Sequence, residues 1–178
     1  MKKSILLPLI AILLAAGLLF GLSFGLNGIA SAKAQAEHLQ LMQTLLPGSE
    51  TFTVEAYTGE DANIRAVYRG EGGYVIETAV QGYADEITML VGVSSEGKVT
   101  GLVVRALSET VGLGAKALKD HKFLSQFLNT SEQTEVGTDV DAISGATVTS
   151  KAIAKSVNSA VAFVTGADID SGATAWGG

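Results

Sequence analysis

The sequence has no cysteine, and it has only two histidines and two prolines among its 178 residues. Without cysteine the chain can form no disulfide, can hold no iron–sulfur cluster through thiolates and has no thiol nucleophile. Its histidines, His38 and His121, lie far apart without the spacing of a metal site, so we expect no metal centre. The fingerprints of dinucleotide and P-loop sites are missing as well.

Basic residues are also scarce. Lysine and arginine number 12 against 18 aspartates and glutamates, which gives a formal net charge of −6. Two of the lysines, Lys2 and Lys3, precede an apolar N-terminal segment, so the remainder of the chain is more acidic still. Because an acidic surface repels the phosphates of nucleic acids, we expect no nucleic acid partner.

One long apolar segment occurs, at the N-terminus. No charged residue interrupts Ser4–Leu26, which as a helix would reach roughly 34 Å, enough to cross a bilayer. A cleaved signal peptide is the alternative, because residues 28–34 are mostly small, but signal peptides have apolar regions of only about 7 to 15 residues. The length therefore favours an uncleaved, single-pass transmembrane helix in contact with membrane lipid. Lys2 and Lys3 in front of it indicate a cytoplasmic N-terminus, with the rest of the chain outside.

Beyond this segment, apolar residues recur first at helical and then at strand spacing. A linker helix is predicted before Pro47-Gly48, with one apolar stripe of Leu39, Met42, Leu45 and Leu46. Strand patterns then predict an antiparallel sheet over residues 51–57, 63–70, 73–83, 87–94 and 99–107. Two helix-prone stretches follow, at residues 112–128 and 148–166. Strands in one block and helices in the next are typical of an α+β domain.

A short motif, Ser144-Gly145-Ala146-Thr147, lies directly before the last predicted helix. A helix N-terminus presents unpaired backbone N–H groups and the positive end of the helix dipole, and both favour a bound phosphate. Gly145 permits close backbone approach, and Ala146 adds little bulk. Taken alone, the motif is more typical of an N-cap. Lys151, one turn after Thr147, is either a counter-charge for a phosphate or a solvated surface lysine.

A wider pattern favours the phosphate. The spacing Asp-x-x-Ser-Gly-Ala-Thr-x-Thr, from Asp141 to Thr149, resembles the flavinylation motif of the FMN-binding domain family. Upstream, residues 82–117 resemble the central hairpin of that family and its Ser-Glu-Thr-x-Gly-Leu-Gly loop, although Val111 replaces the usual proline and Ala84-Asp85-Glu86 replaces a glycine- and proline-containing turn. The resemblance implies that Thr147 carries FMN through a phosphoester bond, attached by a flavin transferase that uses FAD. It also implies that the other motif residues bind the cofactor, namely Asp141, Ser144, Gly145, Ala146 and Thr149.

The upstream loop supplies candidates for contacts with the flavin ring. Glu109 and Thr110 are candidate hydrogen-bond partners of the isoalloxazine edge. Gly112 and Gly114, with Leu113 between them, either let the backbone approach the ring or only end a strand and begin a helix.

In length and layout the chain is most similar to the G subunits of Rnf electron-transport complexes. That resemblance implies a membrane-anchored flavoprotein subunit that relays electrons between other subunits in the bacterial inner membrane, with its FMN domain on the extracytoplasmic side. The complex would couple electron transfer between ferredoxin and NAD to sodium or proton translocation, and this chain would be a carrier without a complete active site of its own. Two alternatives stay open: the C subunit of a sodium-pumping quinone reductase, and a non-redox tethered binding or assembly module in which Thr147 is only a helix cap.

The C-terminal tail contains a second Ser-Gly-Ala-Thr, which ends at Thr174. No helical segment follows Thr174, so a phosphate there would have no helix N-terminus to bind. Thr147 is therefore the preferred acceptor. The expected division of the chain is an N-terminus with the anchor, a linker helix, an FMN-binding domain and a flexible tail, at residues 1–31, 32–48, 49–166 and 167–178.

Overall fold

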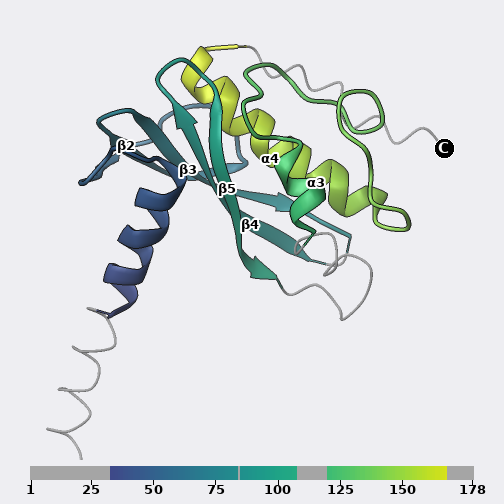
Figure 1. The fold of residues 1–178 in the computed structure, drawn as a ribbon, viewed down its shortest axis with the longest axis horizontal. Helices are drawn as coiled ribbons and strands as arrows, with labels where there is room; N and C mark the ends of the chain where they lie inside the picture. The colour runs from purple at the N-terminus through teal and green to yellow at the C-terminus, as the bar shows by residue number, and fades with distance from the viewer. Residues whose placement is uncertain (1–32, 84, 108–119, 168–178) are drawn as a thin grey trace, which may run out of the picture. The chain divides into compact units, whose positions relative to one another are not determined.

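A computed structural model describes residues 33–83, 85–107 and 120–167 of the chain. Five antiparallel strands form one sheet in chain order, namely β1 (Thr53–Glu55), β2 (Ile64–Gly70), β3 (Gly73–Gln81), β4 (Glu86–Ser94) and β5 (Val99–Leu107). In the described part of the chain after β5, two helices are found, α3 (His121–Ser125) and α4 (Thr147–Thr165), and α4 lies across one face of the sheet (Figure 1). The predicted α+β class, with an antiparallel sheet and flanking helices, is confirmed.

The main core lies between α4 and this face of the sheet. Alternate residues of β4 point into it, and four of them are fully buried: Ile87, Met89, Val91 and Val93. The apolar positions of α4 recur at helical spacing and meet them: Ile153, Val157, Ala160 and Val161. Because α4 presents mostly small side chains to the sheet, the helix can pack closely against β3 and β4.

The opposite face of the sheet is covered by the end of a helix over residues 33–45. Met42, Leu45 and Leu46 are buried there against Val75 and Leu90, as the predicted apolar stripe required. The prediction was wrong for the fourth residue of the stripe, Leu39, whose side chain is 38% exposed. The chain divides into two compact units, and the boundary in the sequence lies between Gln40 and Leu41. The three buried residues belong to the second unit.

Tyr68 borders this second cluster. Burial, and then the nearby carboxylate of Glu77, raise the pKa of its hydroxyl group, because both disfavour the phenolate. Arg105, 3.9 Å from the Glu77 carboxylate, acts in the opposite direction.

Several predicted boundaries were wrong. The first strand covers only Thr53–Glu55, whose exposed side chains at the sheet edge gain little from a longer pairing. The third strand ends at Gln81 because the chain then turns, with the N–H of Gly82 donating to the carbonyl of Asp85 over 2.8 Å. In the second half of the predicted helix 112–128, only His121–Ser125 is helical, and a turn follows it.

The predicted anchor, Ser4–Leu26, and the predicted tail from Asp168 onward lie outside the described residues. Within residues 33–83, 85–107 and 120–167, none of the helices combines the length and the apolar character of a membrane span.

Candidate functional site

A β-turn shapes the motif that precedes α4. The backbone N–H of Ala146 donates to the carbonyl of Ile143 over 2.9 Å, so that Ser144 and Gly145 are the two central residues of the turn. Gly145 has a φ of 79°, which a type II turn needs at this position and which residues with a side chain rarely adopt. The glycine of the motif is therefore a requirement of the backbone.

Thr147 is the first residue of α4, and its side chain is exposed. Ala146 occupies the N-cap position, and no side chain makes a capping hydrogen bond there. The helical hydrogen bonds begin with the N–H of Ser150, which donates to the carbonyl of Ala146 over 2.9 Å, so the N–H groups of the first turn have no partner within the helix. An interpretation of Thr147 as the N-cap is thus wrong. Its hydroxyl group lies instead at the positive end of a 19-residue helix.

The remaining candidates around this junction separate by burial. The exposed ones are Asp141, Ser144, Gly145 and Lys151. Ala146 and Thr149 are buried, with 5% and 1% of their surface exposed. Exposed motif residues are therefore gathered where the loop meets the helix, whereas Thr149 lies beneath them and contributes to the packing of the first turn.

The upstream candidates Glu109, Thr110, Gly112, Leu113 and Gly114 lie outside the described residues. Their contacts with the flavin ring stay predictions.

Two polar residues that support the junction were not predicted from the sequence. Gln126, just after α3, accepts a hydrogen bond at its Oε1 from the backbone N–H of Asp141 over 2.9 Å. Ser150, in α4, is fully buried and contacts the turn through its hydroxyl group. A serine four residues after the N-cap on the buried face of an amphipathic helix was the available signal for Ser150, because its hydroxyl can reach the carbonyl one turn back. Gln126 carried no such signal.

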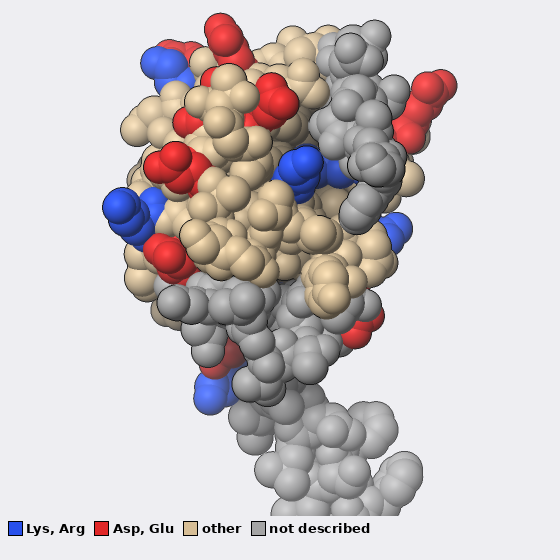
Figure 2. All heavy atoms as spheres, turned by 90° about the vertical axis from the view of Figure 1, so that its right-hand side faces the viewer, with Lys and Arg blue, Asp and Glu red and all other residues tan. Residues whose placement is uncertain are grey.

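The surface at this end of the molecule carries charges of both signs. Figure 2 faces the side on which α4 begins, and there acidic and basic side chains are interspersed among uncharged ones. The acidic residues seen on this side are therefore scattered, and residues other than Asp, Glu, Lys and Arg occupy much of the described surface.

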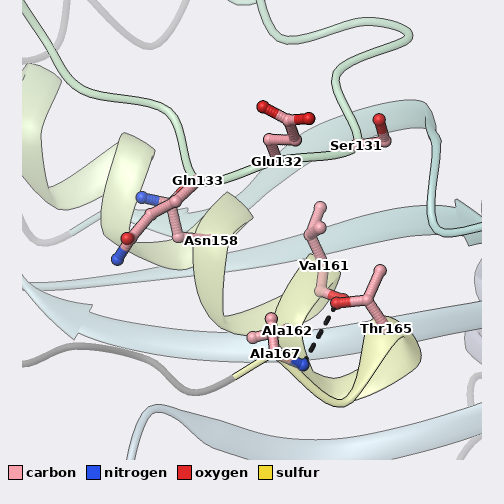
Figure 3. A pocket seen from close by; sticks show the side chains of 8 residues that line it. All are labelled: Ser131, Glu132, Gln133, Asn158, Val161, Ala162, Thr165 and Ala167. Atoms are coloured by element: carbon pink, nitrogen blue, oxygen red, sulfur yellow. Dashed lines mark hydrogen bonds between the residues drawn. The ribbon is translucent and has the colours of Figure 1, made fainter.

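A shallow pocket lies elsewhere, along the C-terminal half of α4 (Figure 3). It is lined by Ser131, Glu132, Gln133, Asn158, Val161, Ala162, Thr165 and Ala167. It is open to solvent and encloses only about 40 Å³, far below the ~300 to 1,000 Å³ of typical ligand pockets. Asn158 follows Thr147 by about 16 Å along the helix axis, so this pocket is separate from the acceptor junction.

Asn158, at the edge of the pocket, fixes the neighbouring loop to α4. Its Oδ1 accepts from the N–H of Thr134 over 2.9 Å, and its Nδ2 donates to the carbonyl of Thr134 over 3.0 Å. Asn158→Ala leaves both buried backbone groups unpaired, and we expect it to lower the free energy of unfolding by about 2 kcal/mol in urea titrations followed by circular dichroism. Ser156→Ala is the control, because Ser156 is also buried in α4 and its Oγ has no hydrogen-bond partner in the described part of the chain. Equal losses in the two variants would contradict this role of Asn158.

Comparison with known proteins identifies the domain that contains the junction. Residues 82–162 match the model of the FMN-binding domain family, and this region includes β4, β5, α3 and most of α4. The G subunit of the ion-translocating oxidoreductase complex of Methanosarcina acetivorans is 36% identical over 141 residues, which cover 70% of this chain and 73% of that protein. This chain belongs to the family of ion-translocating oxidoreductase G subunits. The predicted resemblance to FMN-binding Rnf G subunits is confirmed.

Two further members of the G-subunit family are named for different coupling ions. The G subunit of the sodium-translocating ferredoxin:NAD⁺ oxidoreductase complex of Acetobacterium woodii is 37% identical over 100 residues, which cover 50% of this chain and 47% of that protein. The G subunit of the proton-translocating ferredoxin:NAD⁺ oxidoreductase complex of Clostridium ljungdahlii is 38% identical over 99 residues, which cover 52% and 53%. The matched region therefore spans about half the length of these two relatives.

Proposed function

We propose that this chain is a membrane-anchored flavoprotein subunit that carries FMN covalently on Thr147 and relays electrons within an ion-translocating oxidoreductase complex. One observation supports the attachment site above all. Thr147 is an exposed hydroxyl-bearing residue at the first position of α4, next to a turn that needs Gly145, and it lies within the region that matches the FMN-binding domain.

The groups at the junction suit a phosphoester. The first-turn N–H groups of α4 and the positive end of its dipole favour a phosphate at this position. In the proposed attachment, a bond forms between Thr147 Oγ and the FMN phosphorus of FAD, and the pyrophosphate bond of FAD breaks. AMP leaves with the bridging oxygen, and the hydroxyl proton of Thr147 passes to a base of the flavin transferase. Once bound, the flavin supplies one- and two-electron chemistry that no side chain of this chain provides.

The proposed role is that of a carrier. With no cysteine, the chain holds no cluster through thiolates, so reactions with ferredoxin and with NAD would take place on other subunits. Relatives of nearly equal identity, 37% and 38%, are named for sodium and for proton translocation, so we assign translocation of the ion to the complex rather than to this chain alone. The relatives are named as G subunits, which favours this assignment over the C subunit of a quinone reductase.

The partners follow from the same proposal. They are the other subunits of the complex, the flavin transferase, and membrane lipid around Ser4–Leu26. We place the N-terminus in the cytoplasm and the FMN domain on the extracytoplasmic side of the bacterial inner membrane, because Lys2 and Lys3 precede the apolar segment.

Peptide mass mapping of the full chain, purified from membranes that contain the transferase, tests the proposal directly. We expect the peptide that contains Thr147 to carry the added mass of FMN, and the denatured chain to fluoresce as a flavoprotein in a gel. A chain that binds the other subunits but carries no covalent flavin would support the alternative of a tethered assembly module.

A further inference from the structure

The turn before Thr147 is held from inside α4 by a single buried serine. The backbone N–H of Ile143 donates to Ser150 Oγ over 3.2 Å, and Ser150 Oγ donates to the carbonyl of Ala146 over 2.9 Å. That carbonyl also accepts the N–H of Ser150 over 2.9 Å. One hydroxyl group therefore joins the first and last residues of the turn, and it does so with none of the Ser150 surface exposed.

This arrangement differs from the usual behaviour of serine within a helix. A helical serine often donates to the carbonyl four residues earlier, which by itself concerns only the helix. Ser150 also accepts an N–H from Ile143, which lies before the helix begins. Together with the hydrogen bond from Ala146 N–H to Ile143 carbonyl, it leaves both ends of the turn bonded, while Ser144 and Gly145 between them stay exposed.

The start of the motif is fixed as well. The hydrogen bond from Asp141 N–H to Gln126 Oε1 holds the chain beside α3, and only Ala142 separates Asp141 from the bonded turn. The segment from Asp141 to Thr147 is therefore attached at Asp141, Ile143 and Ala146, although most of its side chains face solvent. An exposed segment with so many backbone attachments is preorganised for recognition.

We propose that Ser150 is a positioning residue for the flavinylation of Thr147, and that its hydroxyl group holds the acceptor turn in the conformation that the flavin transferase binds. The inference rests on the proposed function, since it concerns the same acceptor. When a binding-competent conformation is only partly populated, the apparent affinity falls in proportion. Loss of the Ser150 hydroxyl therefore raises KM for this chain as the transferase substrate, whereas kcat changes little.

The test compares Ser150→Ala with Ser156→Ala in the full chain, using purified transferase and FAD. Both serines are fully buried in α4, but only Ser150 contacts the turn, and Ser156 Oγ has no hydrogen-bond partner among the described residues. We expect KM to rise about ten-fold in Ser150→Ala, which corresponds to the loss of about one net hydrogen bond, with kcat within about two-fold. Ser156→Ala should match the unchanged chain, and Ser150→Thr, which keeps a hydroxyl group, should regain most of the affinity.

A second readout needs no flavin. Amide hydrogen exchange at Ile143 should become faster in Ser150→Ala than in Ser156→Ala, because Ser150 Oγ is the acceptor for that N–H. Unchanged KM and unchanged exchange in Ser150→Ala, an equal rise of KM in Ser156→Ala, or a fall in kcat at constant KM would each overturn the inference. If Ser150→Ala does not fold, a folded Ser150→Thr that is not flavinylated overturns it. Absence of FMN from Thr147 in the unchanged chain refutes the proposed function instead, and Ile143 exchange still reports on the turn.

Discussion

Thr147→Ala is expected to abolish covalent flavin completely, whereas Thr174→Ala is expected to leave it unchanged. Both threonines end a Ser-Gly-Ala-Thr sequence, so the chain itself provides a matched control. Thr147 opens α4, where first-turn N–H groups are available to a phosphate. After Thr174, Trp176 stands at the place that Thr149 takes after Thr147, and the two glycines that follow it are poor helix formers. Thr149 cannot substitute, because only 1% of its surface is exposed. In-gel flavin fluorescence after denaturation measures the attachment in both variants.

The loss of flavin in Thr147→Ala should occur without loss of the fold. An exposed side chain at the first helical position, without a capping hydrogen bond, contributes within about 0.5 kcal/mol to stability. Urea unfolding of both variants before flavinylation should therefore give closely similar midpoints. Fluorescence that persists in Thr147→Ala and disappears in Thr174→Ala would refute the assignment of the acceptor.

The sequence was sufficient to predict the sheet and the start of α4, for identifiable reasons. Strands β3 and β4 are central and pair over their full length, so their apolar runs are long and bounded by turn residues such as Gly97, which has a φ of 83°. The start of α4 was predictable to within one residue, because apolar side chains at helical spacing begin directly after the glycine of the motif.

What could not be predicted depends on contacts between distant segments. Ser150 lies on the apolar face of α4, but only the fold shows that its hydroxyl group accepts the N–H of Ile143 in the turn before the helix. Gln126 pairs with Asp141, 15 residues later in the chain, and no local pattern encodes such a pair. The length of β1 was overestimated for a related reason. The side chains of β1 are exposed at the edge of the sheet, so no pattern of buried apolar residues marks where the strand begins and ends.

Gly92 was also beyond local prediction, and its replacement by alanine is expected to lower the free energy of unfolding by about 3 kcal/mol or more. Gly92 of β4 pairs with Gly101 of β5, and the backbone of Leu45 lies against the two glycines on the face opposite α4. A Cβ atom at Gly92 would lie 2.3 Å from the carbonyl oxygen of Leu45 and 2.7 Å from Thr100 Oγ1. The backbone of Leu45 would have to move to make room for this Cβ atom. We expect that movement to disturb both the hydrogen bond from Thr100 Oγ1 to the Leu45 carbonyl and the packing of Leu46.

Gly72→Ala is the matched control for Gly92→Ala, since a Cβ atom at Gly72 would meet no atom within 4 Å. We expect its stability to change by less than about 0.5 kcal/mol in the same urea titration, so equal effects of the two substitutions would contradict close packing of Leu45 on the sheet. The contact between Gly92 and Leu45 lies on one face of the sheet, whereas α4, which begins after the acceptor turn, packs on the other face. Folded Gly92→Ala should therefore still accept FMN on Thr147 with an unchanged KM. If Gly92→Ala loses stability but keeps its affinity for the transferase, two roles are independent. The packing of residues 41–49 on the sheet then contributes to stability, whereas Ser150 positions the acceptor.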